Sequence, residues 1–227
     1  SKTYDKKRYV VDNLDLKIED GEFVFIVGRS GAGKSTISKL LLREEKVTSG
    51  TLHVNEYKLE KLKNFRIPLY RRNLGVVFQD FKLFAFTLGE NIALSEKYDS
   101  EKVSECIRNV NFEGRYLNMK NGLQTNLYKN FDDEGVEISG GEEQKIALAR
   151  ALYNDTEFMI FDEPTASLDP RSESEIYNMM RKMLYNHTTV FVSHRLSSCR
   201  FSNTIYVLHH GELVQSGNHE TLLSIPN

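Results

Sequence analysis

Continuous apolar runs alternate along the chain with segments whose apolar residues recur at helical spacing. The runs FVFIVG (23–28), FMIFDE (158–163) and TTVFVSH (188–194) predict buried parallel strands, because such strands are covered on both faces. Residues 34–44 have helical spacing, and DSEKVSECIRNVNF (99–112) combines such spacing with a helix start. Strands alternating with helices predict an α/β fold with a mostly parallel core sheet.

Further strand signals lie around this pattern. YVVDNLDLKI (9–18), SGTLHV (49–54) and LGVVFQ (74–79) predict three more strands. TIYVLHHGELVQSG (204–217) predicts a hairpin with its turn at the His–Gly pair. Between about 80 and 140 the β-runs vanish, so we expect a helical insertion that interrupts the sheet.

Composition excludes some classes of protein. The 227 residues carry Lys+Arg 30 against Asp+Glu 32, a net charge of -2, so no overall basic field is present to hold nucleic acid. The basic run KNFRIPLYRRN (63–73) is interpreted as a solvated surface, with a contact to a partner's acidic loop as the less favoured alternative. Cys106 and Cys199 lack metal-ligand spacing and favour a reducing cytosolic compartment.

No apolar run approaches the roughly 20 residues that cross a bilayer, so a membrane process would need another chain for its membrane part. The first residue is Ser rather than Met, which favours a trimmed start.

The segment GRSGAGKST (28–36) fits the P-loop pattern G-x-x-x-x-G-K-[ST] between a predicted strand and a predicted helix. Its glycines let the backbone wrap closely around phosphates with N–H groups pointing inward. Lys34 supplies positive charge to the β- and γ-phosphates, and the Ser35 hydroxyl is placed for Mg²⁺. A glycine-rich turn with a chance lysine is the alternative. We expect the segment to bind nucleotide through Gly28, Arg29, Ser30, Gly31, Ala32, Gly33, Lys34, Ser35 and Thr36.

Two carboxylates follow the apolar run at 158–161. They fall at the carboxyl end of a strand, where open α/β sheets bind ligands. Asp162 is expected to hold the magnesium ion, and Glu163 to orient and deprotonate the attacking water. An acidic strand end that closes a turn before Pro164 is the alternative.

SGGE followed by QKIALARAL, then DEPTASLD, then VSHR, resembles the nucleotide-binding subunits of ATP-binding cassette (ABC) transporters. The resemblance covers essentially the whole chain and implies a P-loop NTPase fold with an antiparallel β subdomain. It implies an ATP-binding core over 1–79 and 141–227, an α-helical signature subdomain over 80–140, and ATP and Mg²⁺ as ligands.

The resemblance also implies roles that local chemistry does not reveal. Gln79 would link the metal site to the transport partner, His194 would contact the γ-phosphate, and SLD (167–169) would run along a dimer interface. Taken alone, His194 would more often be a structural histidine. The implied catalytic residues are then Lys34, Gln79, Glu163 and His194, and the implied metal ligands are Ser35, Gln79 and Asp162.

Tyr4 lies 30 residues before Lys34, where the family places an aromatic that stacks on adenine; Tyr9 is the competing candidate. The family signature usually reads Leu-Ser-Gly-Gly-Gln, and here residues 138–142 read ISGGE. The resemblance implies that the nucleotide of a second copy is capped by Ser139, Gly140, Gly141 and Glu142.

The two halves resemble different branches of the family. GEFVFIVGRSGAGKSTISKLLLREEKVTSGTLHV and IPLYRRNLGVVFQDFKL are similar to the cell-division ATPase of the FtsE type. From FTLGENIALSE onward the chain is similar to exporter-type subunits, particularly in SHRLSSCRF and HHGELVQSGNHETLL. The change falls near Phe84–Thr87 and leaves two interpretations, a divergent natural subunit and a recombinant chimera.

The favoured hypothesis is an ATP-hydrolysing subunit that works as a head-to-tail homodimer with two ATP molecules between the copies. It would be cytoplasmic, peripheral at the inner face of the membrane, and would drive a transmembrane partner. A small-molecule P-loop kinase, a soluble cassette protein of DNA repair or translation, and a chimera that retains nucleotide binding without coupling are the alternatives. Turnover that rises more than linearly with protein concentration would favour the dimer.

Overall fold

The computed structural model describes residues 1–4, 9–130, 132–165, 170–185, 187–195, 199–200 and 202–224. The predicted interface segment 167–169 therefore lies outside the described residues. The chain divides into two compact units. The first comprises Ser1–Leu74, Glu157–Glu163 and Leu184–Asn227, and the second comprises Gly75–Thr156 and Pro164–Met183. The expected subdomain over 80–140 stays a prediction.

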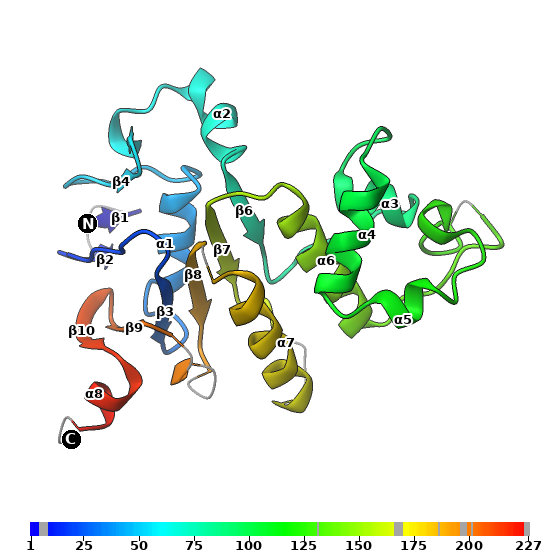
Figure 1. Ribbon diagram of the computed structural model, residues 1–227. Helices are drawn as coiled ribbons and strands as arrows, with labels where there is room; N and C mark the ends of the chain where they lie inside the picture. Colours follow the sequence, from blue (N-terminus) through cyan, green and yellow to red (C-terminus); the bar gives the residue numbers. More distant parts are fainter. Residues whose placement is uncertain are drawn as a thin grey trace. The chain divides into compact units, whose positions relative to one another are not determined.

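The first unit is built on a largely parallel sheet (Figure 1). Its strands run in the order β10-β9-β3-β8-β7. β3 pairs in parallel with both β8 and β9, β7 pairs in parallel with β8, and β10 closes the hairpin antiparallel to β9. The strands are β3 (Phe23–Gly28), β7 (Phe158–Asp162), β8 (Thr188–Ser193), β9 (Thr204–His209) and β10 (Glu212–Gly217). The predicted mostly parallel α/β sheet is confirmed.

Aromatic side chains fill the centre of this sheet. Phe25 and Phe161 both lie opposite Phe191 in the strand register, so the three rings share one face. Phe191 stacks on Phe25 with ring centroids 5.0 Å apart and on Phe161 at 4.6 Å. All three side chains are buried. The stack fixes β7 against β8, and so places the residues that follow these two strands at the same edge.

Short strands and helices complete the first unit. The helix α1 (Lys34–Leu41) packs against β3, β7 and β8. Two small antiparallel sheets are formed by β1 (Lys2–Thr3) with β2 (Tyr9–Val11), and by β4 (His53–Val54) with β5 (Tyr57–Lys58). The other elements are η1 (Leu59–Lys61), η2 (Asn64–Arg66), α2 (Ile67–Arg71) and α8 (His219–Leu223).

Two predicted strands are shorter than their sequence patterns. The strand expected over 9–18 ends at Val11, because Asn13 has a φ of 40° and turns the backbone out of extended conformation. The strand expected over 49–54 is reduced to β4, since Gly50 has a φ of 87°. In both cases a turn residue with positive φ interrupts the extended backbone that the surrounding alternation predicts.

The second unit is helical apart from β6 (Leu74–Val77), which starts at the last residue of the first unit. The helices α3 and α4 both pack on α6, whose buried alanines permit close approach. Asp99 caps α4 through hydrogen bonds from two backbone amides, as its sequence predicts. The elements are α3 (Leu88–Ala93), α4 (Ser100–Asn109), α5 (Glu113–Tyr116), η3 (Gly122–Gln124), α6 (Gly140–Tyr153) and α7 (Pro170–Met183).

One buried amide holds the segment where the two resemblances meet. The Asn91 side chain accepts from the Phe84 N–H at 2.8 Å, and its Nδ2 lies 2.9, 3.3 and 3.0 Å from the carbonyls of Phe84, Phe86 and Thr87. Arg150 donates through Nε to the Asn91 carbonyl at 2.8 Å. The segment 84–87 is therefore hydrogen-bonded to helix α3, and α3 is in turn hydrogen-bonded to α6 of the same unit.

Among the residues described, no helix combines the length and the apolar character that a membrane crossing requires.

Candidate functional site

The turn between β3 and α1 is a tightly packed glycine loop. Gly31 and Gly33 have φ values of 79° and 98°, which side chains rarely adopt. A Cβ on Gly33 would lie 2.5 Å from the Val10 carbonyl oxygen, and one on Gly28 would lie 2.5 Å from the Leu208 carbonyl oxygen. Glycine is therefore required at positions 28 and 33 by the backbone that packs on the loop.

Lys34 lies inside this loop. Its side chain is only 5% exposed, and Nζ donates to the carbonyls of Gly28 at 2.8 Å and Arg29 at 3.2 Å. Within the described part of the chain, the N–H groups of Gly31 and Gly33 donate to no acceptor. A loop that wraps an ammonium group and leaves backbone amides free can accept an anion with several oxygens.

The strand β7 delivers two carboxylates to the same edge of the sheet. Burial raises the pKa of Asp162, and the negative charge of Glu163 acts in the same direction while Lys34 opposes it. Glu163 has a φ of 49°, uncommon for a residue with a side chain, and its N–H donates to the Val192 carbonyl at 2.9 Å. This bond to β8 supports the unusual backbone of Glu163.

Glu163 lies between two of the other predicted site residues. Its Oε1 is 4.0 Å from Nζ of Lys34, and its Oε2 is 3.1 Å from Nδ1 of His194, which follows β8 directly. The imidazole is about half exposed, whereas the carboxylate is mostly buried. The structure thus brings together three residues from three parts of the sequence, as the parallel register of β3, β7 and β8 requires.

The chemistry of the donor set fits magnesium bound together with phosphate. The part of the chain that is described contains no group of three or more His, Cys, Asp and Glu that could hold a metal by itself. Ser35 is exposed at the second position of α1, and Asp162 is partly buried at the end of β7. Mg²⁺ is typically held by one or two carboxylates, waters and substrate phosphates, so this sparse set suits it.

The second glycine turn, in the other unit, differs from the first. Ser139 caps α6, and its hydroxyl and N–H both donate to Oε2 of Glu142 at 2.9 Å. Among the described residues, and apart from α6's own backbone and the chain neighbours, a Cβ added to Gly140 or Gly141 would meet no atom within 4 Å. The neighbourhood of the turn therefore does not require glycine at either position.

Arg115 is a contact of Glu142 that the sequence did not reveal. Its Nε lies 3.1 Å from Oε1 of Glu142, and its Nη2 donates to the Glu137 carbonyl at 3.3 Å. Both carboxylate oxygens of Glu142 thus have partners in the chain, one in the helix cap and one in the ion pair. The two residues are 27 positions apart, so no local sequence pattern predicts that they form an ion pair.

Gln144 is a second residue that sequence reasoning missed. Its buried side-chain Nε2 donates to the carbonyl of Pro164, the residue after Glu163 in the chain. This bond ties helix α6 to the start of the segment that follows β7. A glutamine two residues beyond the ISGGE turn carries no signal for such a contact.

The structure gives the exposure of the remaining predicted residues but leaves their roles as predictions. Tyr4 is 54% exposed, with Nζ of Lys2 4.8 Å from its ring centroid, and Tyr9 is 42% exposed, so the choice between them stays open. Gln79 is exposed in the turn after β6, in the second unit. Its predicted role at the metal, like the role of Ser139–Glu142 at a phosphate, stays a prediction.

Comparison with known proteins adds to this geometry. The family model described as ABC transporter matches residues 11–166, which is more than half of the chain. The chain belongs to the ABC transporter family. The resemblance on which the predicted fold and site depend is thereby confirmed.

Relatives of this ABC transporter family member include several transporters. It is 35% identical over 219 residues to "ABC transporter B family member 13" of Arabidopsis thaliana, covering 96% of this chain and 17% of that protein. It is 34% identical to the nisin transport ATP-binding protein NisT of Lactococcus lactis subsp. lactis, covering 95% of this chain and 36% of that protein. It is also 34% identical to the ATP-dependent lipid A-core flippase 1 of Colwellia psychrerythraea, covering 96% and 35%.

Among solved structures, a bacterial Atm1-family ABC exporter with ATP bound matches with a TM-score of 0.84 and 34% identity over 97% of this chain. This chain spans 38% of that exporter, 17% of the Arabidopsis relative, 36% of NisT and 35% of the flippase. These alignments run through both halves of the chain, including the part that is similar to FtsE-type ATPases. The chimera therefore stays a hypothesis beside the divergent natural subunit.

Proposed function

We propose that this chain is the ATP-binding and ATP-hydrolysing subunit or domain of an ABC transporter of exporter type. The observation that carries the proposal is the position of Glu163, within 4.0 Å of Lys34 and 3.1 Å of His194 beside an open glycine loop. A partly buried carboxylate between a lysine and a histidine, next to free backbone amides, is suited to act on a water molecule beside a phosphate chain.

In the proposed reaction, Lys34 and the loop amides bind the β- and γ-phosphates, and the helix dipole of α1 favours the anion. Tyr4 stacks on the adenine ring. A magnesium ion held by Ser35 and Asp162 would neutralise phosphate charge. Glu163 accepts a proton from the water whose oxygen forms a bond to the γ-phosphorus, while the bond from that phosphorus to the β–γ bridging oxygen breaks and ADP and inorganic phosphate are released. His194 orients the Glu163 carboxylate, and its imidazole contacts the γ-phosphate.

The rest of the site is proposed to come from a second copy. The turn Ser139–Glu142 stands at the N-terminus of the 14-residue helix α6, where free N–H groups and the helix dipole favour an anion. Gly140 and Gly141 are free of intrachain crowding, so glycine there is explained better by the close approach of something outside the chain. Two such turns would cap two nucleotides in an isologous dimer.

The whole transporter is also part of the proposal. This chain spans 17%, 36% and 35% of the three relatives above, and two of these are named for nisin transport and as a lipid A-core flippase. By analogy, this chain acts at the cytoplasmic face of a membrane with a transmembrane partner, and ATP hydrolysis drives the movement of a substrate through that partner.

The test is the Glu163→Gln variant, with Glu44→Gln as a matched control at an exposed carboxylate of the same unit. We expect Glu163→Gln to bind ATP as the unchanged chain does, to lose at least about 100-fold in phosphate release, and to accumulate as an ATP-bound dimer. Glu44→Gln should behave like the unchanged chain. Retention of full turnover by Glu163→Gln would refute the assignment.

A further inference from the structure

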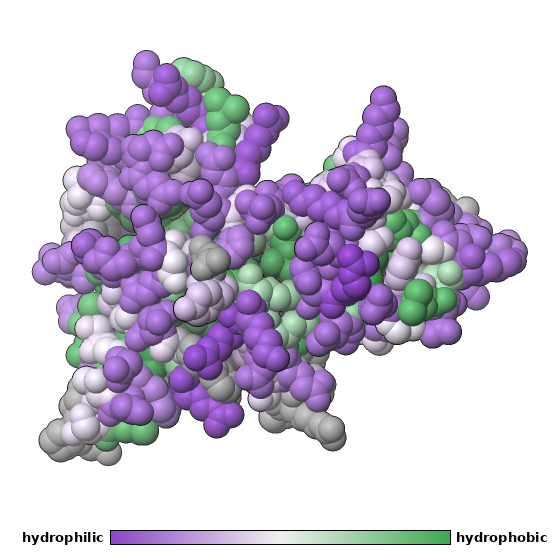
Figure 2. Space-filling view, viewed as in Figure 1, coloured by the Kyte–Doolittle hydropathy of each residue, from purple (hydrophilic) through white to green (hydrophobic). Residues whose placement is uncertain are grey.

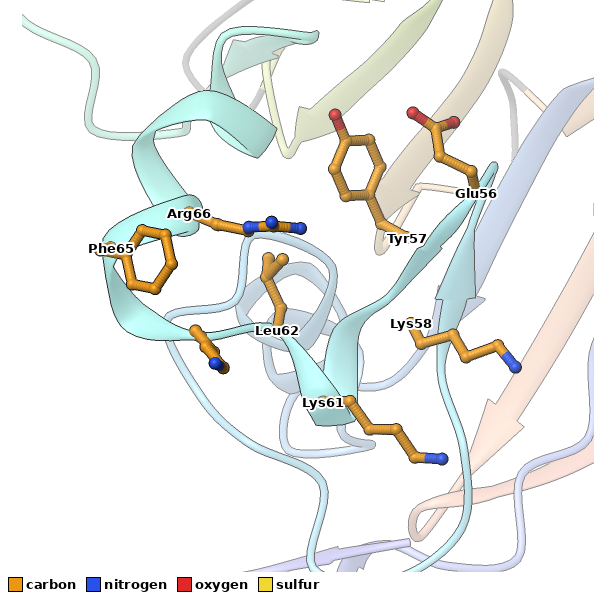
Figure 3. A pocket seen from close by; sticks show the side chains of 8 residues that line it. Glu56, Tyr57, Lys58, Lys61, Leu62, Phe65 and Arg66 are labelled. Carbon is orange, nitrogen blue, oxygen red and sulfur yellow. The ribbon is translucent and has the colours of Figure 1, made fainter.

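A pocket of ≈ 460 Å³ opens in the first unit between β5, η1 and η2, in a segment to which the proposed ATPase assigns no role (Figure 3). Its lining carries four cationic side chains, Lys58, Lys61, Lys63 and Arg66, against one carboxylate, Glu56. The chain as a whole has a net charge of -2. The pocket is therefore a local concentration of positive charge on a slightly acidic protein.

Within the described residues, none of these four cations forms an ion pair. Arg66 lies over the Phe65 ring at 5.8 Å, and the charge of Lys61 helps to lower the pKa of the neighbouring Glu60. All four side chains belong to exposed residues. Positive charge concentrated in the lining of one pocket attracts anions.

The pocket also has an apolar wall. Figure 3 shows the guanidinium of Arg66 and the Leu62 side chain turned toward the ring of Tyr57. The Tyr57 ring stands edge-on to buried Tyr70 at 5.2 Å, and its hydroxyl accepts a hydrogen bond from Asn73. A fixed aromatic face beside cations suits a ligand that carries an apolar or aromatic body next to its charge.

A buried charge holds the backbone of this wall in place. Arg43 is 5% exposed and donates to the carbonyls of Leu59 at 2.7 Å and Leu62 at 3.5 Å. Both carbonyls belong to the segment that forms the pocket. Burying a guanidinium is unfavourable unless it is hydrogen-bonded, so these contacts fix the course of the chain from η1 to Leu62.

We propose that this pocket binds a phosphate ester whose phosphate is held by Arg66 and whose apolar or aromatic body lies on Tyr57 and Leu62, while the positive charges of Lys58 and Lys61 in the same lining attract the anion. Arg66 provides a planar fork for two phosphate oxygens. The same chemistry is offered by a soluble nucleotide and by a phospholipid headgroup.

The surroundings are compatible with the lipid as well as with the nucleotide. Phe65 and Leu69 are 69% and 55% exposed beside the basic residues of the pocket and of α2. Figure 2 shows apolar residues in green among hydrophilic ones in purple over the segment that Figure 1 labels α2. Exposed apolar side chains interspersed with cations are typical of surfaces that bind anionic membranes.

The experiment compares two full-length triple variants, each lacking three positive charges. The pocket variant is Lys58→Gln/Lys61→Gln/Arg66→Gln, and the control is Lys17→Gln/Lys46→Gln/Arg108→Gln, at exposed positions away from the pocket. Both are made with Lys34→Ala, which weakens phosphate binding in the glycine loop. One arm measures ADP binding by calorimetry, and the other measures co-sedimentation with vesicles of phosphatidylglycerol or of phosphatidylcholine.

We expect the pocket variant to bind at least about tenfold more weakly than the control in one arm. Weaker ADP binding by the pocket variant assigns a soluble nucleotide. Weaker co-sedimentation with phosphatidylglycerol vesicles, with ADP binding equal to that of the control variant, assigns a lipid headgroup. Equal binding by the pocket and control variants in both arms would overturn the proposal. Neither binding measurement depends on ATP hydrolysis, so this experiment can fail or succeed independently of the test at Glu163.

Discussion

The ion pair between Arg115 and Glu142 gives a quantitative test of how the ISGGE turn is held. We consider Arg115→Ala, Glu142→Gln and the double variant. Glu142→Gln removes the charge but keeps an acceptor for the Ser139 cap, because glutamine serves at this helix position as glutamate does. Arg115→Ala removes the charge and the bond to the Glu137 carbonyl. The double-mutant cycle cancels these separate losses and isolates the pair.

The expected coupling energy follows from distance and exposure. The atoms are 3.1 Å apart, but the side chains of Arg115 and Glu142 are 40% and 26% exposed, so water and salt screen the attraction. Partly exposed pairs of this kind contribute about 0.5 kcal/mol, and up to about 1 kcal/mol at low salt. Glu142→Ala would in addition lose the cap contact, which costs about 1 kcal/mol more.

The assay is urea unfolding of the four chains followed by circular dichroism, at low salt and at about 1 M salt, where the Debye length falls to about 3 Å. The pair Lys120–Glu134 is the control, since its side chains are 83% and 68% exposed at 3.7 Å and its coupling should be near zero. Coupling above about 2 kcal/mol that persists in high salt, or no coupling at low salt, would refute this account of Glu142.

Three further predictions follow from the buried structure. Asn91→Ala should destabilise the chain by about 3 kcal/mol, measured by urea unfolding, because it leaves backbone groups of residues 84–87 without partners. Phe191→Ala should lower the free energy of unfolding by about 3–5 kcal/mol, since it opens the ring stack of the sheet; Phe191→Leu should cost clearly less. Burial raises the pKa of Cys106 to about 11 and of Cys199 to about 12, so neither thiol should react with a chromogenic disulfide at pH 8 until urea is added. Rapid labelling in the native chain would contradict that burial.

The parts of the site that could be predicted are those carried by the central strands. Apolar runs of four or more residues predicted β3, β7 and β8 with ends accurate to about one residue. Parallel strands place their carboxyl ends at one edge, which is why Lys34, Glu163 and His194 could be expected near one another. Their convergence depends on the sheet and, for Lys34, on the glycine loop between β3 and α1.

What could not be predicted depends on single backbone angles and on pairs far apart in sequence. The early end of β2 results from the turn at Asn13, which breaks an apparently regular alternation. The ion pair of Arg115 with Glu142 and the bond of Gln144 to Pro164 join residues at least 20 positions apart. No local pattern encodes such contacts, because they depend on how α5, α6 and the segment after β7 pack.

The two glycine turns look alike in sequence, yet the structure gives their glycines different physical reasons. Gly33 is enforced from within, because a Cβ there would lie 2.5 Å from the Val10 carbonyl oxygen and its φ is 98°. Gly140 and Gly141 lie in the first turn of α6 without a positive φ, and no described atom beyond the helix backbone and the chain neighbours lies within 4 Å of an added Cβ. Alanine inside a helix is favoured over glycine by about 1 kcal/mol, so two glycines there lower the helix's own stability. The loss of helix stability at these two uncrowded positions is explained if another molecule must approach the backbone closely there. The phosphate of a nucleotide bound to a second copy, as proposed above, would need such an approach.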